Sequence, residues 1–258
     1  MYNAFFSGTF DVAEFITEAF VIFFIGLILY LRREDRREGY PLEDDISGRL
    51  APGGSLFFVA TPKTFILPLD KGTVTVPNDR RDSPDLKARR TAVADGSPLE
   101  PTGDPLLAGI GPGSYAQRAK RPDLLRHGGT KIAPLRLCPG FSLDARDPKV
   151  IGAKVTGADG AVAGTVVDAW IDRTEFLIRY LEIELPGSGR RVLAPMPLAL
   201  VRRAKGDIHI DALLASQFAN VPALGNPDQI TLDEEERVAA YFGGGLLYAT
   251  PDRTEPYL

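Results

Sequence analysis

The chain has 258 residues, a formal net charge of −4, and 25% charged residues. A balance so near neutrality is atypical of nucleic-acid-binding proteins, which usually carry a basic excess. The single cysteine, Cys138, excludes an internal disulfide, and two histidines are too few to favour a zinc site of the common His/Cys type.

The most hydrophobic stretch covers residues 12–31, which contain no lysine or arginine. About 20 helical residues span the ~30 Å hydrocarbon layer of a bilayer, so we predict a transmembrane helix here. A secretory signal peptide would carry its positive charge before the apolar run, and a buried core helix would not need flanking arginines. Both alternatives are therefore disfavoured.

Basic residues follow this helix at once. The positive-inside rule places them in the cytoplasm and makes residues 1–11 a short periplasmic N-terminus. Gly39 and Pro41 are expected to stop the helix soon after it leaves the membrane. The residues that we predict at the membrane interface are Arg32, Arg33, Arg36, Arg37 and Tyr40.

Residues 32–149 are rich in proline and glycine, and 14 of the 21 prolines lie between Pro41 and Pro148. Proline removes a backbone donor and fixes φ, which excludes long helices and central strands. Only short strands are expected, at residues 64–67 and 73–76 around a Lys71–Gly72 turn. We interpret this region as extended chain lying on another surface, either its own domain or, preferably, partner subunits.

Residues 150–258 have a different pattern. Residues 162–172 and 178–185 alternate polar and apolar side chains, and further short strands are predicted at 190–194, 198–202 and 207–210. Such spacing indicates a small antiparallel barrel. Asp211 is predicted to cap a short helix at 212–219. Thr231 and Glu234 have the spacing of a capping box for a helix at 232–242, which the glycines at 243–245 would end.

The predicted fold class is thus a single transmembrane α-helix plus a cytoplasmic mainly-β domain with extended segments and a C-terminal helix. No Walker loop, nucleophile elbow, CxxC or HExxH motif is present, so no enzyme is predicted. The glycines at 109–113 follow no clear strand and are interpreted as an ordinary loop.

One polar cluster has a sharper interpretation. Asp172, Glu175 and Arg179 lie at the turn that joins the two best-predicted strands. On its own such a tip is a solvated surface ion pair of little energetic value. If another surface covered it, burial and repulsion between the carboxylates would raise a carboxyl pKa toward neutrality, and that group could then transfer protons.

Several blocks resemble one known family. They are residues 30–42 (YLRREDRREGYPL), 62–68 (PKTFILP), 101–105 (PTGDP), 164–168 (GTVVD), 170–173 (WIDR), 218–222 (FANVP) and 244–249 (GGLLYA). Together they are similar to the H subunit of the purple-bacterial type photosynthetic reaction centre, and the resemblance extends over the whole chain. It implies a non-pigmented subunit whose helix lies beside the L and M subunits. Its cytoplasmic PRC-type barrel would cap them over the quinone sites.

The resemblance also implies residue roles. Asp172, Glu175 and Arg179 match polar positions of a proton path to the secondary quinone, with Glu175 as the central carboxylate. His127 matches one histidine of the proton-uptake region. Gly129 stands where a second histidine can occur and Leu125 where an aspartate can, so a metal-binding proton entrance is not expected.

By the same resemblance this chain alone binds no cofactor. The complex would carry bacteriochlorophyll, bacteriopheophytin, quinones and non-haem iron on the L and M subunits. Its partners would be those subunits and membrane lipid, with a cytochrome subunit and light-harvesting antenna as further candidates, in an inner photosynthetic membrane. The alternative is a membrane-tethered PRC-barrel adaptor for RNA or protein processing, which leaves the block at 30–42 unexplained.

Overall fold

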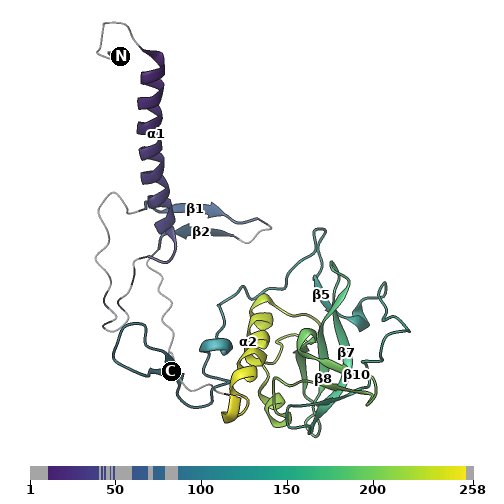
Figure 1. Cartoon of the computed structure of the whole chain (residues 1–258). Coiled ribbons are helices and arrows are strands. Elements are labelled where there is room, and N and C mark those ends of the chain that lie inside the picture. Colours follow the sequence, from purple (N-terminus) through teal and green to yellow (C-terminus); the bar gives the residue numbers. More distant parts are fainter. Residues whose placement is uncertain are drawn as a thin grey trace, which may run out of the picture. The chain divides into compact units, whose positions relative to one another are not determined.

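The computed structural model describes residues 11–40, 60–68, 72–78 and 87–253, together with positions 42, 44, 47 and 49. It divides into two compact units, and we describe each by itself (Figure 1). The first comprises Met1–Pro84 with Val93–Gly96, and the second comprises Asp85–Ala92 with Ser97–Leu258.

The first unit is built on helix α1 (Val12–Glu34). Its N-cap Asp11 accepts hydrogen bonds from the backbone N–H of Ala13 at 2.9 Å and of Glu14 at 3.4 Å. No residue of α1 is buried, and the helix is long and apolar enough to cross a membrane once. The predicted apolar span is confirmed, and the helix continues to Glu34 before the short turn η1 (Asp35–Arg37).

A hairpin of β1 (Lys63–Ile66) and β2 (Thr73–Val76) belongs to the same unit, close to the strands predicted there. An isolated two-stranded hairpin is marginally stable in water. Arg37 holds it, because Nη1 donates to the carbonyl oxygens of Thr61 at 2.5 Å and Val76 at 3.1 Å. The same guanidinium makes two hydrogen bonds to the Glu34 carboxylate, at 2.7 and 2.9 Å. Arg37 thus fastens the hairpin to the end of α1.

The second unit contains the mainly-β domain. Its strands are β3 (Ala88–Arg90), β4 (Leu99–Pro101), β5 (Ile132–Pro134), β6 (Lys154–Thr156), β7 (Val162–Asp172), β8 (Leu177–Glu184), β9 (Arg191–Pro195), β10 (Leu200–Arg202) and β11 (Asp207–His209). β3 and β4 form a separate ladder, and the others form one sheet in the order β10-β11-β6-β7-β8-β9, with β5 paired to β7. Among the described residues β9 and β10 do not pair with each other, so the ladder is not closed.

One pairing departs from the predicted antiparallel barrel, because β11 pairs with β6 in parallel. β6 through β9 alternate in direction, and β10 is antiparallel to β11. β9 and β10 must therefore run in the same sense. The short turn η5 (Met196–Leu198) between them does not reverse the chain.

The C-terminal helix α2 (Leu232–Tyr248) lies beside the sheet and contacts β9 (Figure 1). Its capping box forms as predicted, with reciprocal hydrogen bonds between Thr231 and Glu234. The prediction that glycines 243–245 end this helix is wrong. A Cβ on Gly245 would lie 2.2 Å from the Ala212 carbonyl oxygen, and one on Gly244 would lie 3.1 Å from the Gly113 Cα. These glycines permit close packing inside a continuous helix.

The helix predicted at 212–219 is instead a 3-10 segment, η6 (Ala215–Asn220). Asp211 does not cap it, and its carboxylate lies 3.2 Å from Nη2 of Arg253. The capping contact comes from Gln217, whose side-chain oxygen accepts the backbone N–H of Leu214 at 2.8 Å.

The second unit begins upstream of the predicted boundary at residue 150. β5 pairs with the end of β7, Leu106 is part of the buried core, and the turn η3 (Gly111–Gly113) contacts α2. Part of the proline-rich region, between Leu106 and Pro134, therefore packs within the same unit as the sheet. The core there centres on large buried side chains that include Trp170, Phe218 and Phe242.

Candidate functional site

The turn between β7 and β8 is shaped by Asp172, the last residue of β7. Its side chain is fully buried, and Oδ1 accepts the backbone N–H of Thr174 at 2.9 Å and of Glu175 at 3.1 Å. The Asp172 carbonyl accepts the N–H of Phe176 at 2.9 Å. Among the described residues Phe176 alone, apart from glycines, has a positive φ, of 57°. The aspartate thus folds the tight turn that presents Glu175 and Phe176.

The cation beside this turn is Lys131. Its Nζ lies 3.4 Å from Oδ2 of Asp172 and 4.0 Å from Oε1 of Glu175. Lys131 immediately precedes β5, and its carbonyl accepts the N–H of Arg173 at 2.9 Å. The Glu175 side chain is 55% exposed, so one ammonium lies between a buried and an accessible carboxylate.

These surroundings set the ionisation of Asp172. Burial raises the pKa of its carboxyl, but the N–H groups of Thr174 and Glu175 and the positive charge of Lys131 lower it by more. The net pKa lies below the ordinary aspartate value. Asp172 is therefore a stable carboxylate in this structure, although it is out of contact with water.

Arg179 does not join this pair, contrary to the predicted cluster. A register shift between Trp170 and Ile171 pairs Ile171 with Ile178 and Trp170 with Tyr180, which leaves Arg179 without a cross-strand partner. Its exposed side chain forms no ion pair within the part of the chain that the structure describes. Lys131, which the sequence interpretation overlooked, takes the position expected for the guanidinium.

Arg179 acts instead on a second titratable group nearby. The Tyr180 hydroxyl donates to Oε2 of Glu235, on the first turn of α2, at 3.0 Å. Burial raises the pKa of Glu235, while the Tyr180 hydrogen bond and the positive charges of Arg179 and Lys131 oppose that increase. Glu235 was not predicted as a site residue, because only the tertiary fold brings α2 to β8.

His127 occupies an exposed position in a turn in which the N–H of Leu125 donates to the Gly129 carbonyl and the N–H of Gly128 donates to the Leu125 carbonyl. Gly129 has a φ of 82°, which L side chains rarely adopt, so a histidine there would strain the backbone. In the described ranges no three His, Cys, Asp or Glu side chains form a possible metal site. The same ranges contain no hydrogen bond or ion pair that joins His127 to Asp172 or Glu175.

The residues predicted at the membrane interface have unequal surroundings. Arg37 is buried in the contacts described above. Arg33 Nη2 donates to the Thr61 hydroxyl at 2.9 Å, and the Arg36 guanidinium lies 5.2 Å from the Tyr40 ring centroid. Arg32 is exposed. Lipid contact by the five predicted residues, Arg32, Arg33, Arg36, Arg37 and Tyr40, stays a prediction.

A buried polar network that was not predicted lies along β7 and β8. Nη1 of Arg136 donates to Asp168 at 2.9 Å and to Glu182 at 2.8 Å, and the indole Nε1 of Trp170 donates to Glu182 at 3.0 Å. Nη2 of Arg136 also holds the loop carbonyl of Pro227 at 2.7 Å. The alternation of β8 puts Glu182 on its polar face, and Arg136 covers Glu182 on that face. This network stabilises the fold and has no free group for chemistry.

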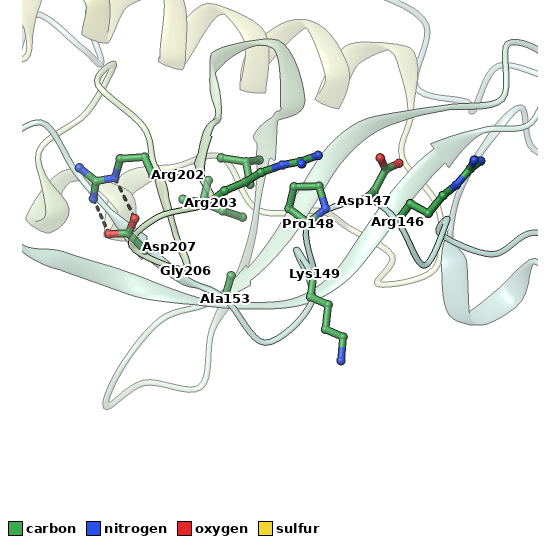
Figure 2. A pocket seen from close by; sticks show the side chains of 11 residues that line it. Arg146, Asp147, Pro148, Lys149, Ala153, Arg202, Arg203, Gly206 and Asp207 are labelled. Atoms are coloured by element: carbon green, nitrogen blue, oxygen red, sulfur yellow. Dashed lines mark hydrogen bonds and ion pairs between the residues drawn. The ribbon is translucent and has the colours of Figure 1, made fainter.

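A depression of about 390 Å³ lies between residues 146–149 and the β10–β11 turn (Figure 2). Figure 2 shows Arg202 turned toward Asp207, and its Nε donates to that carboxylate at 2.8 Å. Lys149 and Arg146 extend away from this pair. The charged groups do not converge on a common point, so the depression is not a candidate site.

Comparison with known protein families gives two matches. Residues 4–137 match the family described as photosynthetic reaction centre, H-chain N-terminal region. Residues 144–216 match the PRC-barrel domain. The first match covers more than half of the chain, and the turn with Asp172 and Glu175 lies within the second.

Proposed function

The chain belongs to the photosynthetic reaction centre H-chain family, and from that premise we propose that it caps the L and M subunits and assists proton delivery to the secondary quinone. The family is a structural, non-pigmented part of a reaction-centre complex that assembles with other subunits, and it is not an enzyme family.

We place the N-terminus on the periplasmic side of the photosynthetic membrane and the second unit on its cytoplasmic side. The basis is the arginine block after α1, since positive residues favour the cytoplasmic side. With this orientation the β-domain lies on the side where a reduced quinone must receive its protons.

The observation that carries the proposal is the arrangement at the β7–β8 turn. Glu175 is an accessible carboxylate held beside a buried carboxylate and a lysine. Its neighbours Phe176 and Leu177 are exposed apolar side chains, with Phe176 78% exposed. Adjacent exposed apolar side chains can form part of a surface that a partner covers. Contact with the L and M subunits would bury Glu175 together with them.

The proposed chemistry at Glu175 is proton relay. A quinone that takes up two electrons from the pigmented subunits also takes up two protons to become a quinol. In each relay step a Glu175 carboxylate oxygen accepts a proton from hydronium of the solvent, which leaves water, and then releases that proton toward the quinone oxygen. His127, exposed on the preceding turn, is proposed as part of the uptake surface.

The test is flash-induced absorbance on the purified complex that carries Glu175→Gln. Glutamine keeps the shape but cannot ionise, so the proton-coupled second electron transfer to the secondary quinone should slow at least about tenfold. The first transfer between quinones should change less, and Asp172→Asn should have a smaller effect than Glu175→Gln. Glu184→Gln is the matched control, because Glu184 is a half-exposed glutamate on the same strand.

Native rates of the second transfer in Glu175→Gln from about pH 6 to pH 9 would refute the proton-relay proposal. Equal slowing in Glu184→Gln would do the same, since the effect would then follow from charge removal anywhere on β8.

A further inference from the structure

We propose that Lys131 is a positioning residue of this site: its ammonium holds Asp172 ionised and thereby assigns the transferred proton to Glu175. The inference rests on the proposed function for the meaning of that proton. It adds a residue from outside the predicted cluster and a division of roles between the two carboxylates.

The two carboxylate oxygens of Asp172 have different partners. Oδ1 receives two backbone N–H groups of the turn, at 2.9 and 3.1 Å. Oδ2 is buried and has no hydrogen-bond partner among the described residues, and the nearest cation is Lys131 at 3.4 Å. A buried carboxylate oxygen is costly unless a charge compensates it. The two N–H groups stabilise the carboxylate at Oδ1, and Lys131 supplies the compensating charge on the side of Oδ2.

The Lys131 ammonium lies between the carboxylates of Asp172 and Glu175. Lys131 is 0.6 Å closer to Asp172 than to Glu175, from the two distances of 3.4 and 4.0 Å. Asp172 is fully buried, whereas more than half of the Glu175 side chain is accessible. Glu175 is therefore the carboxylate of this pair that solvent reaches, and the one that can exchange a proton with water.

Other charges lie around Lys131 and the turn. Arg173 is within the turn, and Lys131, Arg179 on β8 and Asp123 before β5 all act on Glu235 of α2. Arg173 is engaged by the Thr130 carbonyl at 3.1 Å, and Glu235 by the Tyr180 hydroxyl at 3.0 Å. Lys131 has the only ammonium or guanidinium within 4.0 Å of Asp172 in the described residues.

Lys131 also reaches the turn from a separate part of the sequence. It belongs to the segment matched as the H-chain N-terminal region, whereas both carboxylates lie in the segment matched as the PRC barrel. The pairing of Ile132 with Asp172 in the β5–β7 ladder fixes this contact. The inference therefore predicts a functional connection between the two regions.

The experiment is an infrared titration of the protonated-carboxyl C=O band in the complete detergent-purified complex, kept in the dark. Native complex is compared with Lys131→Gln and Lys131→Arg, and with Lys149→Gln as an exposed-lysine control. Samples with ¹³C-labelled aspartate distinguish an Asp band from a Glu band. This readout does not depend on quinone turnover.

In Lys131→Gln we expect the pair to bind its first proton roughly one to three pH units higher than in the native complex. The new band should shift with ¹³C-aspartate, since Asp172 has lost its counter-charge, and Lys131→Arg should restore the native titration. A merely structural lysine would change assembly or stability without moving a proton from Glu to Asp. If Lys131→Gln fails to assemble, assembly regained in Asp172→Asn/Lys131→Gln would support the inference, and continued failure would overturn it.

An unchanged titration in Lys131→Gln, a shift of the same size in Lys149→Gln, or a new band insensitive to ¹³C-aspartate would each overturn the inference. The infrared result for Lys131 can be distinguished from the electron-transfer result that tests the proton relay. Native electron-transfer rates in Glu175→Gln would refute the proton relay, while the infrared titration would still decide what Lys131 does.

Discussion

Replacement of Arg136 by methionine should destabilise the β-domain more than any comparable surface arginine. Methionine keeps much of the apolar stem but removes the guanidinium that bridges Asp168 and Glu182, at 2.9 and 2.8 Å. Both carboxylates are buried, so the variant leaves Asp168 without its cation and Glu182 with only the half-exposed Arg191 as a counter-charge. Loss of one partner from a buried ion pair costs about 3–5 kcal/mol. We expect about 3 kcal/mol, the lower end, because the Arg136 side chain is 34% exposed and solvent screens its interactions.

The assay is denaturant unfolding of the full chain in detergent, followed by tryptophan fluorescence. Trp170 is the only tryptophan of the chain, is fully buried, and donates its indole N–H to Glu182, so its emission reports on this network. The matched control is Arg191→Met. Arg191 lies 3.3 Å from the same Glu182 but is 52% exposed, and its loss should cost less than about 1 kcal/mol.

A double-mutant cycle isolates the charge contribution. In a Glu182→Gln background Arg136→Met should cost at least about 1 kcal/mol less than in the native chain, since one buried charge is already absent. A cost for Arg136→Met no greater than that for Arg191→Met would refute the reasoning, as would strict additivity with Glu182→Gln.

Two further substitutions test the partner-facing turn and the packing of α2. Phe176→Asn should change the free energy of unfolding by no more than about 0.5 kcal/mol, since asparagine tolerates the positive φ. The same variant should weaken association with the pigmented core about tenfold in a binding titration. Leu200→Asn, an equally polar change at another exposed apolar residue, should leave association intact, and equal weakening by both would contradict the assignment of the turn. Gly245→Ala should lower stability by about 1–3 kcal/mol in the fluorescence assay, because its Cβ would meet the Ala212 carbonyl oxygen at 2.2 Å. Gly140→Ala, with no atom within 4 Å of the added Cβ, should be near neutral, and similar losses in both variants would contradict the packing role.

The family matches divide the sequence near residue 140, but the structure does not divide there. β5 and Arg136 belong to the segment matched as the H-chain N-terminal region, and both are bound to strands β7 and β8 of the segment matched as the PRC barrel. A fragment that starts at residue 144 would lose Lys131 and Arg136 together. The second unit as a whole, Asp85–Ala92 with Ser97–Leu258, is the more natural structural unit.

Local sequence determined the features that depend on neighbouring residues. The uninterrupted apolar run specified α1, and the spacing of Thr231 and Glu234 specified the start of α2. Alternation specified β7 and β8, because side chains of a strand point to opposite faces in turn. Family-specific blocks such as residues 30–42 indicated the H-chain family by their order of residue types alone.

Tertiary structure decided what depends on register and on contacts between distant segments. A one-residue register shift near Trp170 removed Arg179 from the predicted cluster, and the β5–β7 ladder put Lys131 in its place. Alternation alone could not show that Arg136 covers the polar face of β8 and buries Glu182. Glycines 243–245 stop a helix by local propensity, but close contacts of Gly244 and Gly245 with Gly113 and Ala212 keep them inside α2. In each case packing between segments far apart in the sequence overrode the local preference, since a pattern within one segment carries no information about what the fold places against it.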